Sequence, residues 1–444
     1  MAEEKSGHKH TRRVPPNGKD DGHQDGYEGW KALLLRWSNG IIVANMHNAC
    51  VALEQDPQWR GMLRLNEFAG EAEADAASPL GRILSWKEEH TREVARWLQR
   101  HGINTGVRTT QEAIALVAAQ RRYHPVRDYF ASLRWDGTRR LHSWLKDIMN
   151  AGSESKETES YISEAGACWM RSAVARILWP GCKVDHMLIF DGDQGIRKST
   201  VLEIIASSPW FLSGLRDFHS TDTLMRAHKA WIVEIDELSA FRSSTLEMIK
   251  SFITTKTDVF RKPYALLPEP HSRQFVLAGT TNNQEYLADA TGNRRFWPVT
   301  VKAPFQLETL HKMRDQLIAE AIHDVQKGVK WYFDDDRIIG YAAEEQDQRL
   351  EADIWEDDII AFEEKHKWEP LSAAMVAKGL ELPAAQQNRS AEMRITAVLK
   401  KLGRKRVKDS KRPRMWERDW DEVGGRPGTP GLGIPLKTQE TDPD

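Results

Sequence analysis

The residues of this sequence that most plainly suggest chemistry lie near its middle, in the stretch GDQGIRKST. It nearly matches the phosphate-binding pattern G-x-x-x-x-G-K-[ST], in which backbone N–H groups and a helix N-terminus point at the phosphates of a nucleotide. In such a loop Lys198 neutralises the β- and γ-phosphates, and the hydroxyl of Ser199 binds Mg²⁺. The candidate nucleotide-binding residues are Gly192, Asp193, Gln194, Gly195, Ile196, Arg197, Lys198, Ser199 and Thr200.

One residue departs from the pattern, because Arg197 stands at the position of the second glycine. The substitution is tolerated if the backbone φ of Arg197 is negative, as it is for a residue that begins a helix. We then expect the arginine side chain to point away from the phosphates. By itself the match leaves a working site, a decayed site and a chance similarity open, so the other motifs must decide.

Two further segments end in polar residues that suit phosphate chemistry. WIVEIDE ends in Asp236 and Glu237, of which the first could bind Mg²⁺ through water and the second could orient and deprotonate the attacking water. FVLAGTTNN ends in hydroxyls and amides, and an amide there could contact the γ-phosphate or the lytic water. The alternatives are an ordinary helix N-terminus for the acidic pair and a simple turn for the polar run.

The segment TGNRRFWPV places Arg294 and Arg295 between a Gly-Asn turn and an apolar anchor. An arginine that reaches toward a neighbouring subunit can stabilise the charge that develops in phosphoryl transfer, as an arginine finger does. For an isolated arginine pair, a surface salt bridge is the better interpretation. The position of this pair after the three segments above favours the finger.

The elements that must position these residues alternate between strands and helices. Three short apolar runs, MLIF, WIVEI and FVLAG, have the length and composition of buried strands. Helical patterns separate them, which is typical of a central, largely parallel sheet in an α/β domain. MLIFD supplies a strand before the loop and STVLEIIA a helix after it. The loop therefore has the strand–loop–helix context that it requires.

Composition gives the chain the character of an ordinary globular protein. Its 444 residues allow two or three domains, and its net charge of −2 confines any nucleic-acid contact to local patches. Three cysteines without paired spacing disfavour a disulfide framework or a zinc site and fit a reducing cytoplasm. No apolar run approaches the ~20 residues that span a bilayer, and the polar N-terminus lacks the apolar core of a secretory signal. We expect a cytoplasmic protein without a membrane partner.

Hydrophobic periodicity and polar breaks divide the chain further. TREVARWLQRHG and TQEAIALVAAQRRYH predict helices ahead of the sheet, and SAEMRITAVLKKLGRKRVKDSKRPRMWERD predicts a helix followed by a basic hairpin, the order of a winged-helix module. The expected parts are a disordered arm over 1–28, a mostly helical domain over 29–125, the α/β domain over 126–301, a helical and acidic linker region over 302–360, a winged-helix-like module over 361–423 and a disordered tail over 424–444.

Taken in order, GDQGIRKST, WIVEIDELSAFRSSTLEMIKSFITTKTDVFRKPY and FVLAGTTNNQEYLADATGNRRFWPV resemble the virulence-associated E family. That family consists of superfamily 3-type helicase ATPases of prophages and mobile elements. The preceding YHPVRDYFASLRWDGTRRLHSWL is also similar to it, so the resemblance covers roughly residues 120–300. The family loop often reads G-x-Q-G-x-x-K-S, so Arg197 need not indicate decay. The resemblance implies a P-loop NTPase fold, AAA+-like and of the superfamily 3 helicase type, over 126–301.

The resemblance also implies roles for single residues. It makes the amide of Asn282 a sensor of the γ-phosphate, and it places a DNA-contacting element in TTKTDVFRKPY, for which a solvated basic loop is the alternative. The candidate catalytic residues are Lys198, Glu237, Asn282, and Arg294 or Arg295 as the finger; the candidate metal ligands are Ser199 and Asp236; the candidate DNA contacts are Lys256, Arg261 and Lys262.

The function that the resemblance implies is an ATP-dependent DNA helicase, acting with Mg²⁺ as a hexameric ring on single-stranded or forked DNA of a phage, prophage or mobile element. Family members are often fused to a primase, and the first ~125 residues show no pattern for one. We therefore expect that a separate protein supplies priming or that this is a shortened member of the family. Two alternatives remain: an ATPase switch in a phage-defence or regulatory complex, and a non-catalytic DNA-binding protein with a dead nucleotide site. Intact Lys198, Asp236 and Glu237 count against the last.

Overall fold

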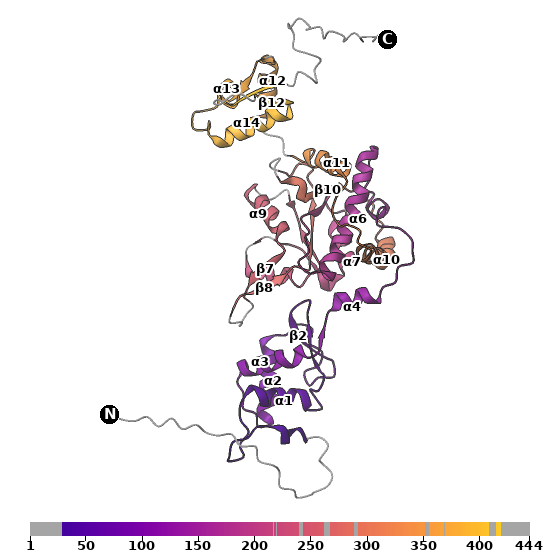
Figure 1. Ribbon diagram of the computed structural model, residues 1–444, viewed down its shortest axis with the longest axis vertical. Helices are drawn as coiled ribbons and strands as arrows, with labels where there is room; N and C mark the ends of the chain where they lie inside the picture. The colour runs from indigo at the N-terminus through magenta and orange to yellow at the C-terminus, as the bar shows by residue number, and fades with distance from the viewer. Residues whose placement is uncertain are drawn as a thin grey trace, which may run out of the picture. The chain divides into compact units, whose positions relative to one another are not determined.

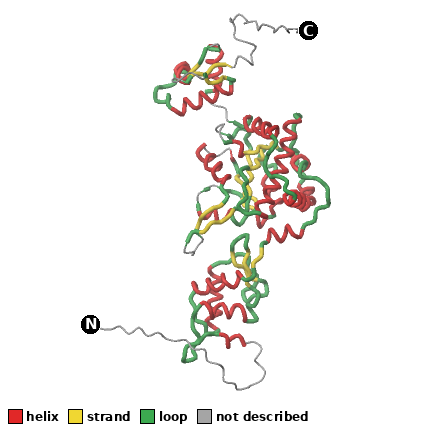
Figure 2. Tube along the Cα trace, in the orientation of Figure 1, coloured by secondary structure: helices red, strands yellow, loops and turns green. Residues whose placement is uncertain are grey.

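The computed structural model describes residues 29–215, 217–218, 220–238, 243–261, 267–287, 292–350, 355–367, 369–407 and 414–418 (Figures 1 and 2). The arm expected over 1–28, the tail expected over 424–444 and Lys262 lie outside the described residues. The contacts divide the chain into a larger unit, Met1–Gln284 with Gly292–Gln348, and a smaller C-terminal unit, Glu285–Thr291 with Arg349–Asp444.

The first part of the larger unit joins helices to a small sheet. Apolar residues recur three and four apart in its two longest helices, so Val94 and Leu98 of one and Ile114 and Val117 of the other are buried in one core around Trp59. A three-stranded sheet in the order β2-β1-β3 adds to the helices that the sequence predicts. The elements are η1 (Gly29–Leu33), α1 (Met46–Gln55), β1 (Leu63–Asn66), β2 (Glu71–Ala74), α2 (Glu88–Arg100), α3 (Val107–Ala119) and β3 (Arg122–Tyr123).

A five-stranded parallel sheet forms the centre of the larger unit, which confirms the predicted α/β core with a parallel sheet. The strand order is β10-β4-β9-β6-β5. The strand that comes last in the chain, β10, is therefore at one edge, and β9 lies between β4 and β6. Two strands were not predicted from the sequence, β5 and β10. The strands are β4 (Met187–Asp191), β5 (Phe211–Leu212), β6 (Ile232–Ile235), β9 (Val276–Thr281) and β10 (Phe296–Thr300).

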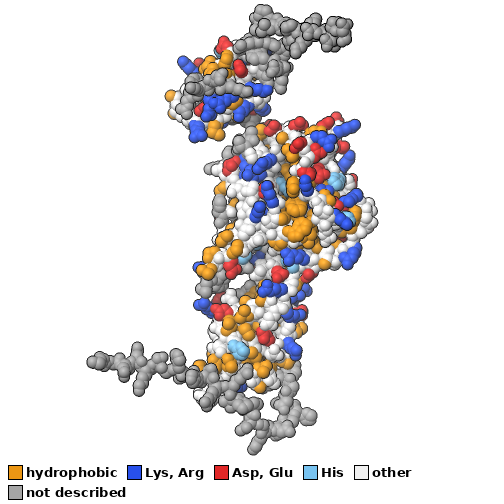
Figure 3. Space-filling view, in the orientation of Figure 1, with side chains coloured by type: hydrophobic (Ala, Val, Ile, Leu, Met, Phe, Trp, Pro, Cys, Tyr) orange, Lys and Arg blue, Asp and Glu red, His pale blue; other side chains and the backbone are white. Residues whose placement is uncertain are grey.

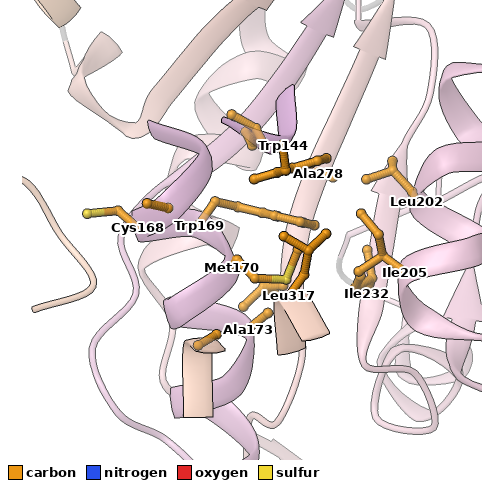
Figure 4. Packing of buried hydrophobic residues seen from close by; sticks show 14 of the residues in the cluster. Trp144, Cys168, Trp169, Met170, Ala173, Leu202, Ile205, Ile232, Ala278 and Leu317 are labelled. Carbon is orange, nitrogen blue, oxygen red and sulfur yellow. The ribbon is translucent and has the colours of Figure 1, made fainter. Parts of the chain in front are cut away.

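One face of the sheet is covered by three helices, α6 (Lys156–Leu178), α7 (Lys198–Ala206) and α10 (Leu307–Gln326). Alternate strand residues such as Ile232 and Ala278 pack with Trp169 of α6 (Figure 4). The indole of Trp169 donates to the carbonyl of Leu277 at 2.9 Å. The long helix is therefore fixed to the sheet by both packing and a buried hydrogen bond.

The segment before the sheet leads into α6 through α4 (Pro125–Ser132) and α5 (Trp144–Met149). The stretch AGSESKETES is partly helical, because α6 begins at Lys156. The hydroxyl of Ser155 accepts from the N–H of Thr158 at 3.3 Å, and Glu157 and Glu159 stand in the first turn, where carboxylates favour the positive end of a helix.

The region over 302–360, expected as a linker region, is mostly packed on the sheet domain. Leu310, Leu317, Ile318 and Val325 of α10 belong to the same buried core as α6. The next helix, α11 (Asp336–Asp347), also lies in the larger unit. The reason is the apolar stripe along α10, which must be buried although acidic residues surround it in the sequence.

An antiparallel hairpin stands between the third and fourth strands of the sheet in sequence. It consists of β7 (Thr257–Phe260) and β8 (Glu269–Ser272), with Thr257 paired to Ser272 and Phe260 to Glu269. The preceding helix α9 (Ser243–Thr254) is drawn on the opposite side of the sheet from α6 and α10 (Figure 1). The remaining elements of this region are η2 (Ser208–Trp210), α8 (Thr221–Ala227) and η4 (Asn293–Arg295).

The C-terminal unit has its own core, in which Ile359, Leu371, Ile395 and Trp416 are buried. Its three strands form a sheet in the order β11-β13-β12 with antiparallel pairing. The elements follow the order α12 (Glu356–Lys365), β11 (Leu371–Ser372), α13 (Ala373–Gly379), α14 (Arg389–Lys401), β12 (Arg404–Arg406) and β13 (Met415–Arg418).

In the described part of the chain, we find no helix whose length and apolar character would let it cross a bilayer. All three cysteines, Cys50, Cys168 and Cys182, are free thiols.

Candidate functional site

The carboxyl ends of β4, β9 and β6 meet at one edge of the sheet, because the three strands are adjacent and parallel. Asp191 at the end of β4 pairs with Thr281 at the end of β9, and Ile235 of β6 pairs with Gly279. The loop, the polar turn and the acidic pair that follow these strands therefore start side by side. In open parallel sheets, ligands bind at this edge.

The loop after β4 begins at a position where a side chain would not fit. A Cβ added to Gly192 would lie 2.5 Å from the carbonyl oxygen of Val301 and 3.2 Å from the side chain of Ile196. The N–H of Gly192 donates to the carbonyl of Thr281 at 3.3 Å, which holds the loop against β9. Gly195 has a φ of +80°, a conformation that suits glycine. The two glycines let the backbone turn back over the strand ends.

Arg197 shows why the phosphate-binding pattern has glycine before its lysine. Its φ is 72° and its ψ 34°, in the left-handed region, so the expectation of a negative φ is wrong. The helix begins at Lys198, and Arg197 is the capping residue that turns the chain from the loop into it. A residue with a Cβ in this conformation costs about 1–2 kcal/mol. The Arg197 side chain is exposed, and its orientation away from bound phosphates stays a prediction.

We expect Arg197→Gly to raise the free energy of unfolding by about 0.5–1 kcal/mol and to preserve ATP turnover. Relief of left-handed strain contributes about 1–2 kcal/mol, and the greater freedom of glycine in the unfolded chain offsets about 0.5–1 kcal/mol of it. Arg197→Ala is the matched control, since it removes the same side chain but keeps a Cβ. Urea unfolding measures both. Equal stability of the two variants would contradict the strain argument, and loss of turnover in Arg197→Gly would show that the arginine acts on the nucleotide.

Lys198 carries a buried ammonium group inside the turn of the loop. Its Nζ donates to the carbonyl oxygens of Gly192 at 2.7 Å and Asp193 at 2.8 Å. The residue is 9% exposed, and burial lowers the pKa of Lys198 although Asp191, Asp193 and Glu234 act in the opposite direction. A cation held under a loop that leads into a helix N-terminus suits a phosphate group.

A buried carboxylate, Glu234 of β6, stands beside the first turn of α7. The hydroxyl of Ser199 donates to its Oε1 at 2.6 Å, and the hydroxyl of Thr280 donates to the same oxygen at 2.8 Å. Glu234 is 1% exposed, and burial raises its pKa. Among the described residues, its buried Oε2 has no hydrogen-bond partner. The carboxylate therefore keeps one oxygen unused next to the hydroxyl that we expected to bind Mg²⁺.

Glu234 was not among the residues expected at the site, although the sequence carries a signal for it. Glu234 is the one charged residue of the strand sequence IVEI. Strand residues two apart share a face, so Glu234 points to the same side as Ile232, which packs in the core beside α7. A carboxylate on the face of the sheet that is covered by α7 could have been expected to contact α7.

The acidic pair itself lies directly after β6. Asp236 is half-buried and close enough to Glu234 to help raise its pKa. Glu237 is exposed and has a φ of 52°, a left-handed conformation that is uncommon without glycine and that often marks functional sites. Asn282 is exposed and is the first residue after β9. All three thus lie at the edge that carries Lys198.

Arg294 and Arg295 lie at the amino ends of the parallel strands, whereas the loop with Lys198 lies at their carboxyl ends. They form η4 immediately before β10, whose first residue, Phe296, pairs with Met187 at the start of β4. The loop follows the fifth residue of β4, so the arginines and the loop are separated by the length of a strand, roughly 16 Å. Arg294 is exposed and Arg295 is half-buried. Within one chain, the structure does not bring this pair to Lys198.

The hairpin separates two of the expected DNA contacts. Lys256 is exposed at its base, just before β7, and its carbonyl accepts from the N–H of Arg273 at 2.9 Å. Arg261 is exposed directly after β7, at the end of the strand opposite to Lys256. Arg261 therefore lies toward the tip of a projecting element, where a polymer could contact it, whereas Lys256 lies next to the sheet.

A buried ionic cluster fixes the base of the hairpin. Both oxygens of Asp258 accept from Arg273, each at 2.7 Å, and Nε2 of His228 lies 2.9 Å from one of them. Arg273 also donates to the carbonyl of Phe252 in α9. Burial would raise the pKa of Asp258, but the hydrogen bonds from His228 and Arg273 hold it at about 2. The hairpin is thus tied to the end of α8 and to α9, the two helices that precede it in the sequence.

We expect Glu234→Gln to lower Mg²⁺-dependent ATP hydrolysis by about 10–100-fold while the fold is retained. The amide can still accept the hydrogen bonds of Ser199 and Thr280, but it cannot present a negative oxygen to a cation. Steady-state phosphate release over a range of Mg²⁺ concentrations measures the loss. Glu203→Gln, an exposed residue of α7, is the control. Unchanged hydrolysis in Glu234→Gln would leave Asp236 as the carboxylate that matters.

A family model for the virulence-associated protein E-like domain matches residues 130–352, half of the chain. The chain belongs to this family. The match begins in α4 and extends past α11, so it includes the loop, Glu234, the hairpin and the arginine pair. It confirms the resemblance that the motifs suggested.

Among solved structures, the virulence-associated protein E-like chain is similar to the C-terminal region of NrS-1 in its apo form. One such structure is 12% identical, with a TM-score of 0.42, and the match covers 80% of this chain and 95% of that one. The A form of the same region is 11% identical, with a TM-score of 0.39 and coverage of 80% and 96%. No curated protein matches the chain.

Proposed function

We propose that the chain is an ATP-dependent DNA helicase of the superfamily 3 type, built on a P-loop NTPase core and acting in the replication of a phage, prophage or mobile element. The observation that carries the proposal is the convergence of Lys198, Ser199 and Glu234 at the carboxyl edge of a parallel sheet. Family membership supports the same function.

The residues present fit ATP and Mg²⁺. The Lys198 ammonium could exchange the two backbone carbonyls that it now contacts for phosphate oxygens. The hydroxyl of Ser199 and the unused Oε2 of Glu234 are hard oxygen donors, which Mg²⁺ prefers. Mg²⁺ would neutralise charge on the phosphates. Glu237 would then orient the attacking water and Asn282 would contact the γ-phosphate.

The position of the arginine pair supports a ring. Arg294 and Arg295 lie a strand's length from the loop of their own chain, so a finger role requires the loop of a neighbouring subunit. A closed ring with head-to-tail contacts would place each pair beside the next site. We propose a hexamer, located in the cytoplasm of a bacterial host and assisted by a separate primase.

Two elements are proposed to contact DNA. The hairpin would present Arg261 to the strand in the central channel. The C-terminal unit has the helix and strand order of a winged helix, and its visible face carries many basic side chains (Figure 3). Its exposed basic residues on α14 and β12 are Arg389, Lys400, Lys401, Lys405 and Arg406.

The test is ATP hydrolysis with and without single-stranded DNA, followed by strand displacement on a forked substrate. We expect DNA to stimulate hydrolysis, and we expect Arg261→Ala to reduce displacement by about 10-fold while basal hydrolysis is preserved, because one phosphate contact is lost. Arg92→Ala, an exposed arginine of α2, is the control. Hydrolysis without displacement would favour the ATPase switch, and absence of nucleotide binding would favour the non-catalytic DNA-binding protein.

A further inference from the structure

A cluster of buried polar side chains that includes Arg176 and Arg273 lies near the amino ends of the sheet strands, away from the proposed nucleotide site. It surrounds a small cavity with room for about one water-sized particle, about 10 Å³. The cavity lies beside the first residues of β9, between α6 and the base of the hairpin. Its lining residues are Arg176, Val184, His186, Ile253, Arg273, Phe275, Val276 and Leu277.

Arg176 is the residue of this cavity whose charge lacks a partner. It is 2% exposed, and its Nη2 donates only to the carbonyl of Val184, at 3.3 Å. Among the described residues, its buried Nε and Nη1 have no hydrogen-bond partner. Burial lowers the pKa of Arg176 to about 10, so the guanidinium is still charged at neutral pH. The C-terminal end of α6 offsets only about half of a unit charge.

His186 supplies a second unused polar atom. The residue is 5% exposed, its ring stacks on Trp297 with centroids 3.7 Å apart, and its Nε2 has no hydrogen-bond partner among the described residues. Burial lowers the pKa of His186 to about 3, so the ring is neutral at physiological pH. A neutral imidazole can donate one N–H into the cavity.

The other charges around the cavity do not neutralise Arg176. Arg273 also lines it, but its charge is balanced by Asp258 in a two-point ion pair. Asp185 forms an ion pair with Lys183 at 3.1 Å. One positive charge is therefore left over in a buried space, and an uncompensated buried charge is strongly unfavourable. A water molecule could accept hydrogen bonds there but would leave the charge.

We propose that this cavity binds a chloride ion, held by an N–H group of the Arg176 guanidinium and by the Nε2–H of His186. A monatomic anion of one negative charge balances the cluster and is only slightly larger than water, whereas phosphate and sulfate exceed the cavity. The bound ion would stabilise the sheet where the ionic cluster of Asp258 and Arg273 fixes the hairpin.

The test compares the thermal stability of the full chain in sodium chloride, sodium bromide and sodium gluconate at equal ionic strength. Gluconate is too large for the cavity, so we expect both halides to raise the Tm by about 2–4 °C relative to it. We expect Arg176→Met to abolish this difference. Arg64→Met, which removes a partly exposed arginine paired with Glu73, is the control that keeps it.

Anomalous diffraction from crystals grown in bromide locates the ion in the unmodified chain and remains informative if Arg176→Met does not fold. A bromide peak between Arg176 and His186 supports the site. A cavity that holds only water, or a Tm that is equal in chloride and gluconate, overturns it.

Discussion

Replacing Lys198 with alanine is expected to lower the rate of ATP hydrolysis by at least about 10²–10³-fold, and strand displacement with it. The ammonium group lies where a bound triphosphate would need a positive charge, inside the loop and next to Ser199 and Glu234. Because the charge would act on the phosphates as they react, its loss should appear mainly in kcat. Phosphate release at saturating ATP measures the effect.

The control for Lys198→Ala is Lys183→Ala, which removes an exposed lysine paired with Asp185 ahead of β4. Both proteins should have nearly the same Tm, since the Lys198 ammonium makes only two hydrogen bonds to its own loop. Full hydrolysis in Lys198→Ala would remove the basis of the proposed function. Loss of hydrolysis in Lys183→Ala as well would show that the assay reports folding.

Loss of the arginine finger should lower ATP hydrolysis at least as strongly as loss of Lys198, but this loss should be reversible by mixing variants. We expect alanine at whichever of Arg294 and Arg295 is the finger to lower hydrolysis by about 10³–10⁵-fold, and alanine at the other to have a small effect. Since the pair lies a strand's length from its own loop, the inactive finger variant and the inactive Lys198→Ala variant should regain activity when mixed. Some subunit contacts in the mixture would then combine an intact loop with an intact finger.

The matched control is a mixture of Lys198→Ala with Glu234→Gln. Both changes lie on the loop side of the site, so no contact in that mixture is complete, and activity should stay low. Recovery in this control, or no recovery in the finger mixture, would contradict a site shared between subunits. Sizing of the ATP-bound assembly shows whether a ring forms under the same conditions.

The sequence predicted the centre of the fold because its strands are short, apolar and bounded by clear helical patterns. β4, β6 and β9 were expected, and β5 and β10 were not. β5 has two residues, too few to show a pattern. β10 contains Pro298, which argues against a strand, and the structure accommodates it because β10 is an edge strand.

At the candidate site, the features that could not be predicted from the sequence depend on backbone conformation and strand direction. Residue types suggested the chemistry of Lys198, Ser199 and Asp236, but the left-handed φ of Arg197 depends on where the helix begins, which patterns fix only to within a few residues. Glu234 was overlooked because a single carboxylate in a strand gains meaning only when the face opposite it is known. The separation of the arginines from the loop likewise follows from the direction of β10.

The central strand β9 runs from the amino-end side of the sheet to the carboxyl-end side, and its surroundings leave it little freedom to deform. All six of its residues are buried, and β4 and β6 flank it with parallel pairing on both sides. A slip of one residue would turn Val276, Ala278 and Thr280 to the wrong face. In the proposed ring, a displacement of Thr280 would therefore move the whole sheet, together with the hairpin that the Asp258–Arg273 ion pair holds at its base. The length of each step along DNA would then be set by rotation between neighbouring subunits, not by bending of the hairpin.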